Sequence, residues 1–329
     1  MPGISGLRAW WAERSPAAGS AVMATGILSI GLGLTGAGTL SRAAFALAWV
    51  TWVALAAAFV LRLVAEPRQW MAEAESPGAL TSVAATTVLG TRTSAAGART
   101  TAEALLALAA LLCPVLLLLV VRRWGPRMPG SVFLCCVATQ GLAVLAADLA
   151  AAERAAWLAH TALVVFWLGL VLYGVALTRF DTRQVLQGAG DHWVAGGALG
   201  ISALAGARLL MAGDTGLYLW NADDRDVLRT VTVILLVLDV AWYAVLVAAE
   251  AVRPRRGYHV LRWATVFPMG MTAVAVLSVA SAVGVTWLTW PGRLLLWVAV
   301  AAWLVVAAGA LLAARGAGGG TGVRSTGRR

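Results

Sequence analysis

Residues 81–94 read TSVAATTVLGTRTS, and residues 105–121 read LLALAALLCPVLLLLVV. The first stretch contains seven Ser or Thr residues, and the second contains none. Small and hydroxyl side chains favour contact with protein or water, whereas bulky aliphatic side chains tolerate lipid. Two such stretches in succession predict a buried helix followed by a lipid-facing helix. The same contrast recurs along the chain and decides the predicted fold.

The composition of the chain excludes a soluble protein. Of its 329 residues, 60% are hydrophobic and only 12% are charged. Soluble domains average about 45–50% apolar and about 25% charged residues, and disordered chains have still fewer apolar residues. Too few polar residues are present to cover a surface in water. The composition therefore predicts an all-α integral membrane protein.

Ten stretches are long and apolar enough to be predicted as membrane-spanning helices, each needing about 20 residues. Their approximate limits are 19–38, 42–65, 78–97, 101–121, 130–149, 155–178, 190–210, 229–251, 257–284 and 292–314. They form one predicted transmembrane domain over residues 19–314. Residues 1–18 are predicted as an N-terminal segment, and residues 315–329 as a disordered basic tail.

The arginines predict the orientation of these spans. The chain has a net charge of +10, and all 25 of its basic residues are Arg. They lie in short gaps between apolar runs, which favours a membrane surface over nucleic acid as the partner. With the N-terminus in the cytoplasm, 17 arginines fall inside and 8 outside. The positive-inside rule thus predicts both termini in the cytoplasm and a multi-pass protein of the cytoplasmic membrane.

Glycine separates the ten spans into two sets. The odd spans contain 19 glycines, and the even spans, of similar length, contain four. Because small residues allow close helix packing, the odd spans are predicted to form an inner layer and the even spans an outer layer. Five hairpins of this kind could surround a central passage. A packed core without a pore is the alternative.

Several residues on the inner spans are candidates for the wall of such a pore. These pore-lining candidates are Thr25, Gly26, Thr86, Thr87, Gln140 and Gly200. Helix-to-helix hydrogen bonding or close packing would explain the same residues without a pore.

Charged residues within the spans give further candidates. Arg92 and Arg208 fall near the predicted outer ends of inner spans, where a positive charge attracts anions. The alternative is an interfacial arginine paired with Asp148. Asp239 lies in the eighth span, where a carboxylate could carry a coupling proton or make a structural hydrogen bond.

Four segments resemble one transporter family. They are SAVMATGILSIG at 20–31, ATTVLGTR at 85–92, GALGISALAGARL at 197–209 and RWATVFPMG at 262–270. Together they resemble the tellurite-resistance/dicarboxylate transporter family, which includes bacterial tellurite-resistance proteins, fungal malate permeases and sulfite pumps, and slow anion channels of plant guard cells. The resemblance implies five hairpins around a quasi-fivefold pore, and a homotrimer with one pore per subunit. It also implies a pore gate at Phe267, which precedes Pro268.

Phe267 can be interpreted without the family. Pro268 interrupts the helical hydrogen bonding, so a kink is expected beside a large ring on a helix of small residues. The ring would form either a hydrophobic constriction or part of a packed core.

Other functions find little support in the sequence. NADDRD at 221–226 faintly resembles the metal-diphosphate motif of membrane prenyltransferases, but no second acidic cluster accompanies it. Cys113, Cys135 and Cys136 have no spacing typical of a zinc site or a disulfide framework. We therefore predict no enzyme, metal or cofactor. The predicted function is transport of small anions, such as C4-dicarboxylates, sulfite, tellurite, chloride or nitrate, by a channel or by a proton-coupled carrier.

Overall fold

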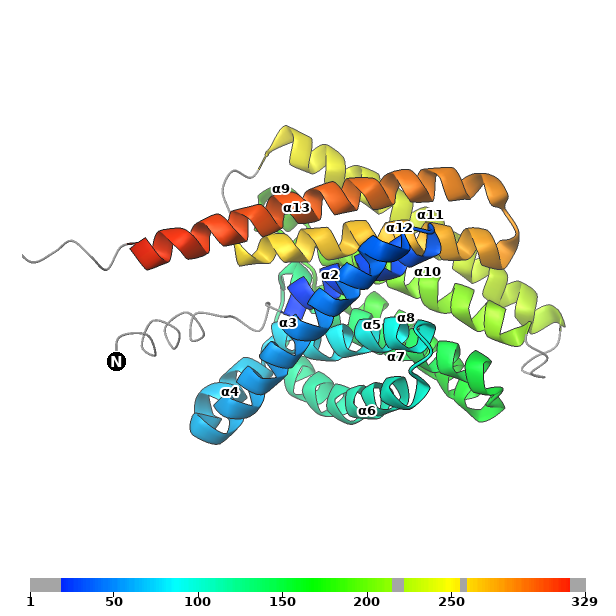
Figure 1. Cartoon of the computed structure of the whole chain (residues 1–329), viewed down its shortest axis with the longest axis horizontal. Helices are drawn as coiled ribbons and strands as arrows, with labels where there is room; N and C mark the ends of the chain where they lie inside the picture. The colour runs from blue at the N-terminus through cyan, green and yellow to red at the C-terminus, as the bar shows by residue number, and fades with distance from the viewer. Residues whose placement is uncertain (1–18, 215–221, 255–258, 320–329) are drawn as a thin grey trace, which may run out of the picture.

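The computed structural model describes residues 19–214, 222–254 and 259–319. All the extended regular elements in these ranges are helices (Figure 1). The only strand-like pairing among them is a single bridge between Met128 and Phe180. The predicted N-terminal segment 1–18 and residues 320–329 of the predicted tail lie outside the described ranges.

The described ranges contain ten helices of 16 residues or more. They are α2 (Gly19–Leu34), α3 (Gly38–Ala65), α5 (Leu80–Ala95), α6 (Arg99–Val121), α7 (Leu134–Glu153), α8 (Ala156–Arg179), α10 (Val194–Gly213), α11 (Ala222–Val252), α12 (Trp263–Val283) and α13 (Thr289–Gly319). Eight of them, with their adjoining 3₁₀ turns, are long and apolar enough to cross a membrane. The other two are α2, which is apolar but shorter, and the Thr-rich α5. An all-α membrane protein is thus supported, and spanning by α2 and α5 stays a prediction.

The helix boundaries depart from the predicted limits at several places. The helix α11 begins at Ala222 instead of 229, and α13 continues to Gly319, past the predicted limit at 314. Two short helices between the predicted spans, α4 (Pro67–Ala74) and α9 (Gln184–Gln187), were not predicted. A 3₁₀ turn precedes several helices: η2 (Pro77–Ala79) before α5, η3 (Gly130–Phe133) before α7, η4 (Asp191–Trp193) before α10, η5 (Val260–Arg262) before α12 and η6 (Thr286–Leu288) before α13.

Burial divides the helices into the two predicted sets. In the apolar 18-residue stretches of the α7, α10 and α12 spans, 89, 89 and 78% of the residues are buried, and most residues of α2 and α5 are buried as well. In the corresponding stretches of α3, α6, α8, α11 and α13, between 6 and 28% of the residues are buried. The five buried helices pack in the cyclic order α2, α5, α7, α10, α12 and back to α2. Each also packs against the exposed helix that follows it in the chain. We call these two sets the inner and outer helices.

Glycines on the inner helices allow the close packing. A Cβ atom added to Gly141 of α7 would collide with the hydroxyl of Thr87 on α5. One added to Gly206 of α10 would collide with Thr232 on α11. At both crossings a threonine side chain of the neighbouring helix packs directly against the glycine backbone and leaves no room for a second side chain. The glycine content of the odd spans thus has a direct packing cause.

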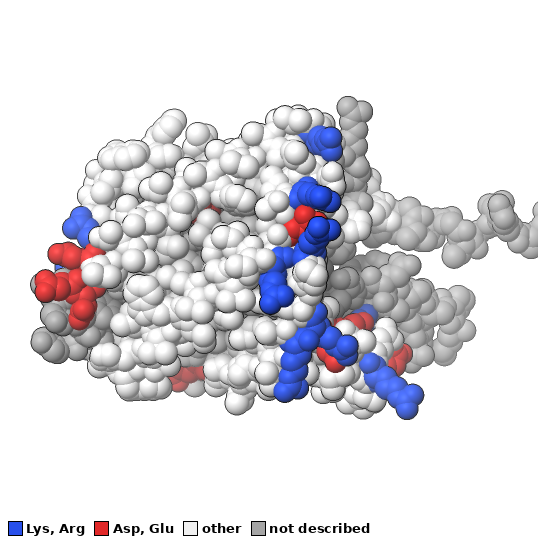
Figure 2. Space-filling view, turned by 180° about the vertical axis from the view of Figure 1, so that it is seen from behind, with Lys and Arg blue, Asp and Glu red and all other residues white. Residues whose placement is uncertain are grey.

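Arginine side chains gather at one end of the molecule. Figure 2 shows arginine side chains along one rim, at the end where α4 lies in Figure 1. The inner helices begin at this end, and the connections there carry Arg68, Arg122, Arg127 and Arg183. Acidic side chains at the same end form ion pairs between Arg62 and Glu73, Arg123 and Glu75, and Arg262 and Glu250. We call this the basic end.

The contact between Gly141 and Thr87 gives a direct test of the inner packing. Gly141→Ala should separate α5 from α7 and lower the free energy of unfolding by roughly 1–3 kcal/mol, as overpacking does in other proteins. Gly174→Ala in α8 is the matched control, because nothing lies within 4 Å of the added Cβ atom there. Thermal unfolding of both variants in detergent measures the difference. Equal midpoints would contradict the packing described.

Candidate functional site

All five inner helices meet at one small cavity at the centre of their ring. The lining side chains are Ile27 and Ile30 of α2, Thr87, Val88 and Thr91 of α5, Gly141 and Val144 of α7, Ile201 and Leu204 of α10, and Met271 of α12. Most of this wall is aliphatic. We call it the central cavity.

Two hydroxyls are the only polar side chains in this wall. Thr87 donates its hydroxyl proton to the carbonyl oxygen of Ala84 at 3.0 Å, and Thr91 donates to that of Thr87 at 3.0 Å. Both protons are therefore used within α5. The wall offers an anion no ready hydrogen-bond donor, and its aliphatic surface disfavours water. Such a wall is typical of a closed hydrophobic constriction.

Phe267 lies beside this cavity along α12. It precedes Met271 by four residues, about one helical turn, so the two side chains share a face of the helix. The ring is 1% exposed. Pro268, next to it, packs against α10 at Gly197, where an added Cβ atom would lie 2.9 Å from the proline Cγ. The predicted gate residue is thus one turn from the central cavity, on the side of the basic end.

Three of the polar pore-lining candidates make contacts with outer helices. Trp303 of α13 donates its indole N–H to the Thr25 hydroxyl, and Trp52 of α3 donates to that of Thr86, both at 3.0 Å. Gln140 donates from Nε2 to the carbonyl oxygen of Phe166 on α8 at 3.0 Å. These bonds join the two layers. Of the four polar candidates, we therefore retain only Thr87 for the pore wall.

The two glycine candidates are also close-packed. A Cβ atom on Gly26 would lie 2.8 Å from Val88 Cγ1, between α2 and α5. One on Gly200 would lie 3.0 Å from the carboxylate Oδ2 of Asp239 and 3.1 Å from Met271 Cγ. Both positions thus match the packing alternative. Gly200 additionally leaves room for the Asp239 carboxyl.

Arg92 extends toward α2 and α3. Its guanidinium donates to Ser29 Oγ at 3.1 Å and to Ser41 Oγ at 3.2 Å, and it lies 5.0 Å from the centre of the Phe45 ring. All of these described partners are uncharged. These contacts leave its positive charge without a neutralising partner among them and direct it toward α3, not into the central cavity.

Arg208 has a charged partner. It forms an ion pair with Asp148, with 3.4 Å between Nη1 and Oδ1, which joins α10 to α7. This pair matches the alternative weighed for Arg208. Because the two charges largely cancel at a distance, we expect Arg208 to attract anions less than Arg92 does.

Asp239 is fully buried between three helices. Its Oδ1 accepts a hydrogen bond from the Thr272 hydroxyl of α12 at 3.0 Å, whereas Oδ2 is buried without a partner among the described residues. The bond ties α11 to the inner helix that carries Phe267. This geometry matches the structural alternative for Asp239, and one carboxyl oxygen remains available for a proton.

Several residues in and near the site were not predicted from the sequence. Thr91 and Met271 are four residues from Thr87 and Phe267, so helical spacing from those two could have found them. Ser278 lies on the same face of α12, and its hydroxyl is buried without a described partner. The aliphatic wall residues carry no chemical signal in the sequence, because they look like ordinary membrane-helix residues.

Within the ranges that the structure describes, no three His, Cys, Asp or Glu side chains form a group able to hold a metal ion. Asn221 of the NADDRD motif lies outside these ranges. The three cysteines are buried and unpaired.

Comparison with known proteins agrees with the resemblance of the four segments. A family model described as voltage-dependent anion channel matches residues 14–311, from shortly before α2 to within α13. No curated protein matches the chain significantly. Since the family match covers nearly the whole chain, the protein belongs to the voltage-dependent anion channel family.

Proposed function

We propose that the chain conducts small anions along the axis of the inner helices and that Phe267 gates this path. Family membership supports an anion channel or transporter function. The observation that carries the finer proposal is the central cavity, to which all five inner helices contribute. The face of α12 that reaches this cavity also carries Phe267 one turn away.

The closed path would exclude anions in two ways. In this proposal the Phe267 ring would occupy the axis and the aliphatic wall beyond it would disfavour water, so an ion would have to lose its hydration without replacement. Opening would require the ring to leave the axis and water to enter. Anions would be attracted from the basic end, where the inner helices start with partial positive charge, and by Arg92 near the other end of the path.

The substrate class remains that predicted from the sequence. C4-dicarboxylates, sulfite, tellurite, chloride and nitrate are all small anions that such a path could pass. The described cavity wall has no charged side chain. We therefore expect ion size and ease of dehydration to determine which anions pass fastest. Flux measurements with proteoliposomes over this panel of anions would rank them.

A proton-coupled carrier of the same fold is the second candidate. It is favoured by one observation, the unpartnered Oδ2 of the buried Asp239. A proton taken up there would alter the bond to Thr272 and so reach the helix of Phe267. The hydrogen bond itself argues equally for a structural role.

We further propose a homotrimer in the cytoplasmic membrane with both termini in the cytoplasm. The arginines of the basic end support this orientation by the positive-inside rule. The outer helices expose large apolar side chains, among them Val64, Leu111 and Val305, which suits contact with lipid or with other subunits.

Truncation of the gate ring tests the main proposal. Phe267→Ala should raise anion flux about tenfold or more, because lowering the barrier to permeation by about 1.4 kcal/mol is enough for a tenfold change. Water can fill the vacated axis, so thermal stability should change little. Phe166→Ala in α8 is the matched control, since its ring is equally buried but lies in an outer helix. It should lose stability, as core Phe→Ala variants do by about 3–5 kcal/mol, without a gain in flux. Loss of stability without a gain in flux for Phe267→Ala would make the ring a core residue.

Cysteine labelling tests which face of α5 meets the path. In a background without Cys113, Cys135 and Cys136, we expect Thr87→Cys to react with a water-soluble thiol reagent faster once Phe267→Ala is added. Thr86→Cys is the neighbouring control, and it should stay unreactive because position 86 contacts Trp52 of α3. Equal rates at positions 86 and 87 would refute the proposed path.

Asp239→Asn separates the two candidate functions. For a channel, the variant should lower the thermal midpoint but leave the effect of a pH gradient on flux unchanged. Thr272→Val is the control, because it removes the same hydrogen bond without changing the carboxyl group. If only Asp239→Asn abolishes a proton dependence of flux, the carrier replaces the channel.

A further inference from the structure

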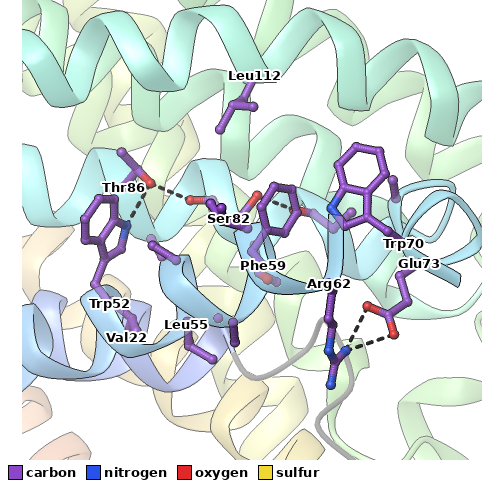
Figure 3. Close-up of a pocket in the computed structure, with 18 of the residues that line it drawn as sticks. Val22, Trp52, Leu55, Phe59, Arg62, Trp70, Glu73, Ser82, Thr86 and Leu112 are labelled. Carbon is purple, nitrogen blue, oxygen red and sulfur yellow. Dashed lines mark hydrogen bonds and ion pairs between the residues drawn. The ribbon is translucent and has the colours of Figure 1, made fainter. Parts of the chain in front are cut away.

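A second and larger cavity lies away from the axis, between outer and inner helices. Its volume is about 280 Å³, and it is bounded by α3, α4, α5, α6 and the start of α2. Figure 3 shows Trp52 of α3 pointing toward Thr86 of α5, and Arg62 of α3 pointing toward Glu73 of α4. Most of the residues that line the space are apolar. We call it the lateral cavity.

The lateral cavity lies at the lipid-facing side of the molecule. It exists because α3 leans away from the bundle, as Figure 1 shows, so that little of α3 is buried. Leu108 of α6 and Val60 of α3 line the cavity, and they are 38 and 56% exposed. A molecule in the bilayer could therefore enter between α3 and α6. Water is a poor occupant of the apolar part of this cavity.

One end of the cavity is polar. The Trp70 ring stacks edge-on against Phe59, with 5.3 Å between ring centres, and its indole Nε1 is buried without an acceptor among the described residues. This contrasts with Trp52, whose N–H is bonded to Thr86. A buried N–H donor without a partner is costly, so a site for an acceptor oxygen is indicated.

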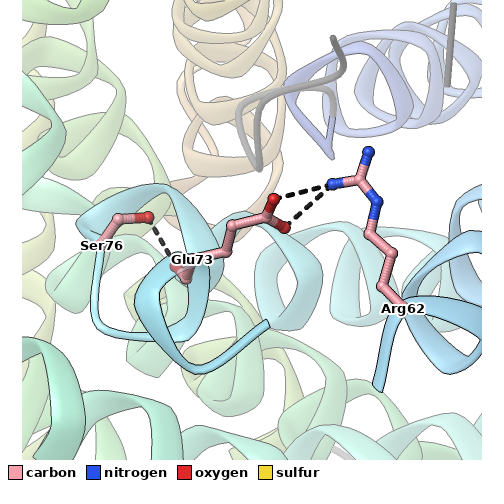
Figure 4. Close-up of polar contacts among 3 residues, drawn as sticks. All are labelled: Arg62, Glu73 and Ser76. Carbon is pink, nitrogen blue, oxygen red and sulfur yellow. Dashed lines mark hydrogen bonds and ion pairs between the residues drawn. The ribbon is translucent and has the colours of Figure 1, made fainter. Parts of the chain in front are cut away.

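Arg62 lies at the same end. Its Nη1 donates to both carboxylate oxygens of Glu73, at 2.9 and 3.0 Å (Figure 4). The pair holds α4 against the end of α3 and closes the cavity on the side of the basic end. Further arginines of this end, Arg68, Arg122 and Arg123, are exposed around it. The polar end thus faces the membrane surface that is rich in positive charge.

We propose that the lateral cavity binds one acyl chain of an anionic glycerophospholipid. The apolar lining would enclose part of the chain, and an ester or phosphate oxygen of the lipid would accept the Trp70 N–H. The headgroup would lie among the arginines of the basic end, where an anionic lipid is favoured. The size of the cavity, at the lower limit for ligand pockets, suits one chain better than a whole lipid.

Native mass spectrometry of purified protein with added phosphatidylglycerol or phosphatidylcholine tests this proposal. We expect one phosphatidylglycerol per chain to remain bound under conditions that remove phosphatidylcholine. Ala56→Phe should abolish this binding, because Ala56 lines the cavity and the new ring fills it. Ala57→Phe is the matched control, since Ala57 is exposed on the same helix and does not line the cavity. Retained binding in Ala56→Phe, or equal loss in both variants, overturns the proposal.

Trp70→Phe provides a test that leaves the cavity open. It removes the N–H donor and keeps an aromatic ring against Phe59, so lipid affinity should fall about tenfold, the effect of one hydrogen bond. Unchanged affinity contradicts the assigned headgroup contact. This variant also keeps the proposal testable if Ala56→Phe fails to fold.

A photoreactive amino acid at Leu108 identifies the occupant directly. A covalent adduct with the mass of a phospholipid supports the site. An adduct with a second copy of the chain would show that another subunit fills the cavity, and the lipid proposal would then be wrong. None of these measurements depends on anion flux, so this inference and the proposed function can fail separately.

Discussion

The hydrocarbon interior of a membrane provides no water to satisfy polar groups, and much of this structure follows from that constraint. Polar side chains of the inner helices are bonded across to the outer layer. Trp303 reaches Thr25, Trp52 reaches Thr86, and Thr272 reaches Asp239. These hydrogen bonds connect the layers at fixed points. The axis is left with an aliphatic wall and two threonines whose hydroxyl protons are already used.

The two-layer arrangement could be predicted from sequence because it depends on side-chain size. Glycine is required where a side chain of the neighbouring helix packs against the backbone, as at Gly141 and Gly206, and bulky residues gather where lipid is the neighbour. The distribution of glycine and of bulky residues along the chain therefore indicates which helices are buried and which face lipid. The short helix α4 was missed, since its eight residues were too few and too polar to stand out between apolar spans.

The direction in which individual side chains of the inner helices point could not be predicted in the same way. The inner helices are buried on nearly all sides, so their sequences have no polar stripe to indicate which face meets the axis. Thr86 and Thr87 are neighbours with the same side chain, yet one meets α3 and the other the central cavity. Phe267 was easier to identify because Pro268 marks its position chemically. The residues that line the central cavity could be identified only from the packing of all five inner helices.

The aliphatic wall of the central cavity has an electrical consequence. A membrane potential falls most steeply across the part of a path that holds no water, and here that part would be the short segment around Val88, Val144 and Leu204. The described wall of this segment carries no charged group on which the field could act. The potential would therefore do its work on the permeating ion, at about 2.3 kcal/mol per elementary charge for each 100 mV. Along the proposed path, the field would drive the ion through the constriction without acting directly on its wall.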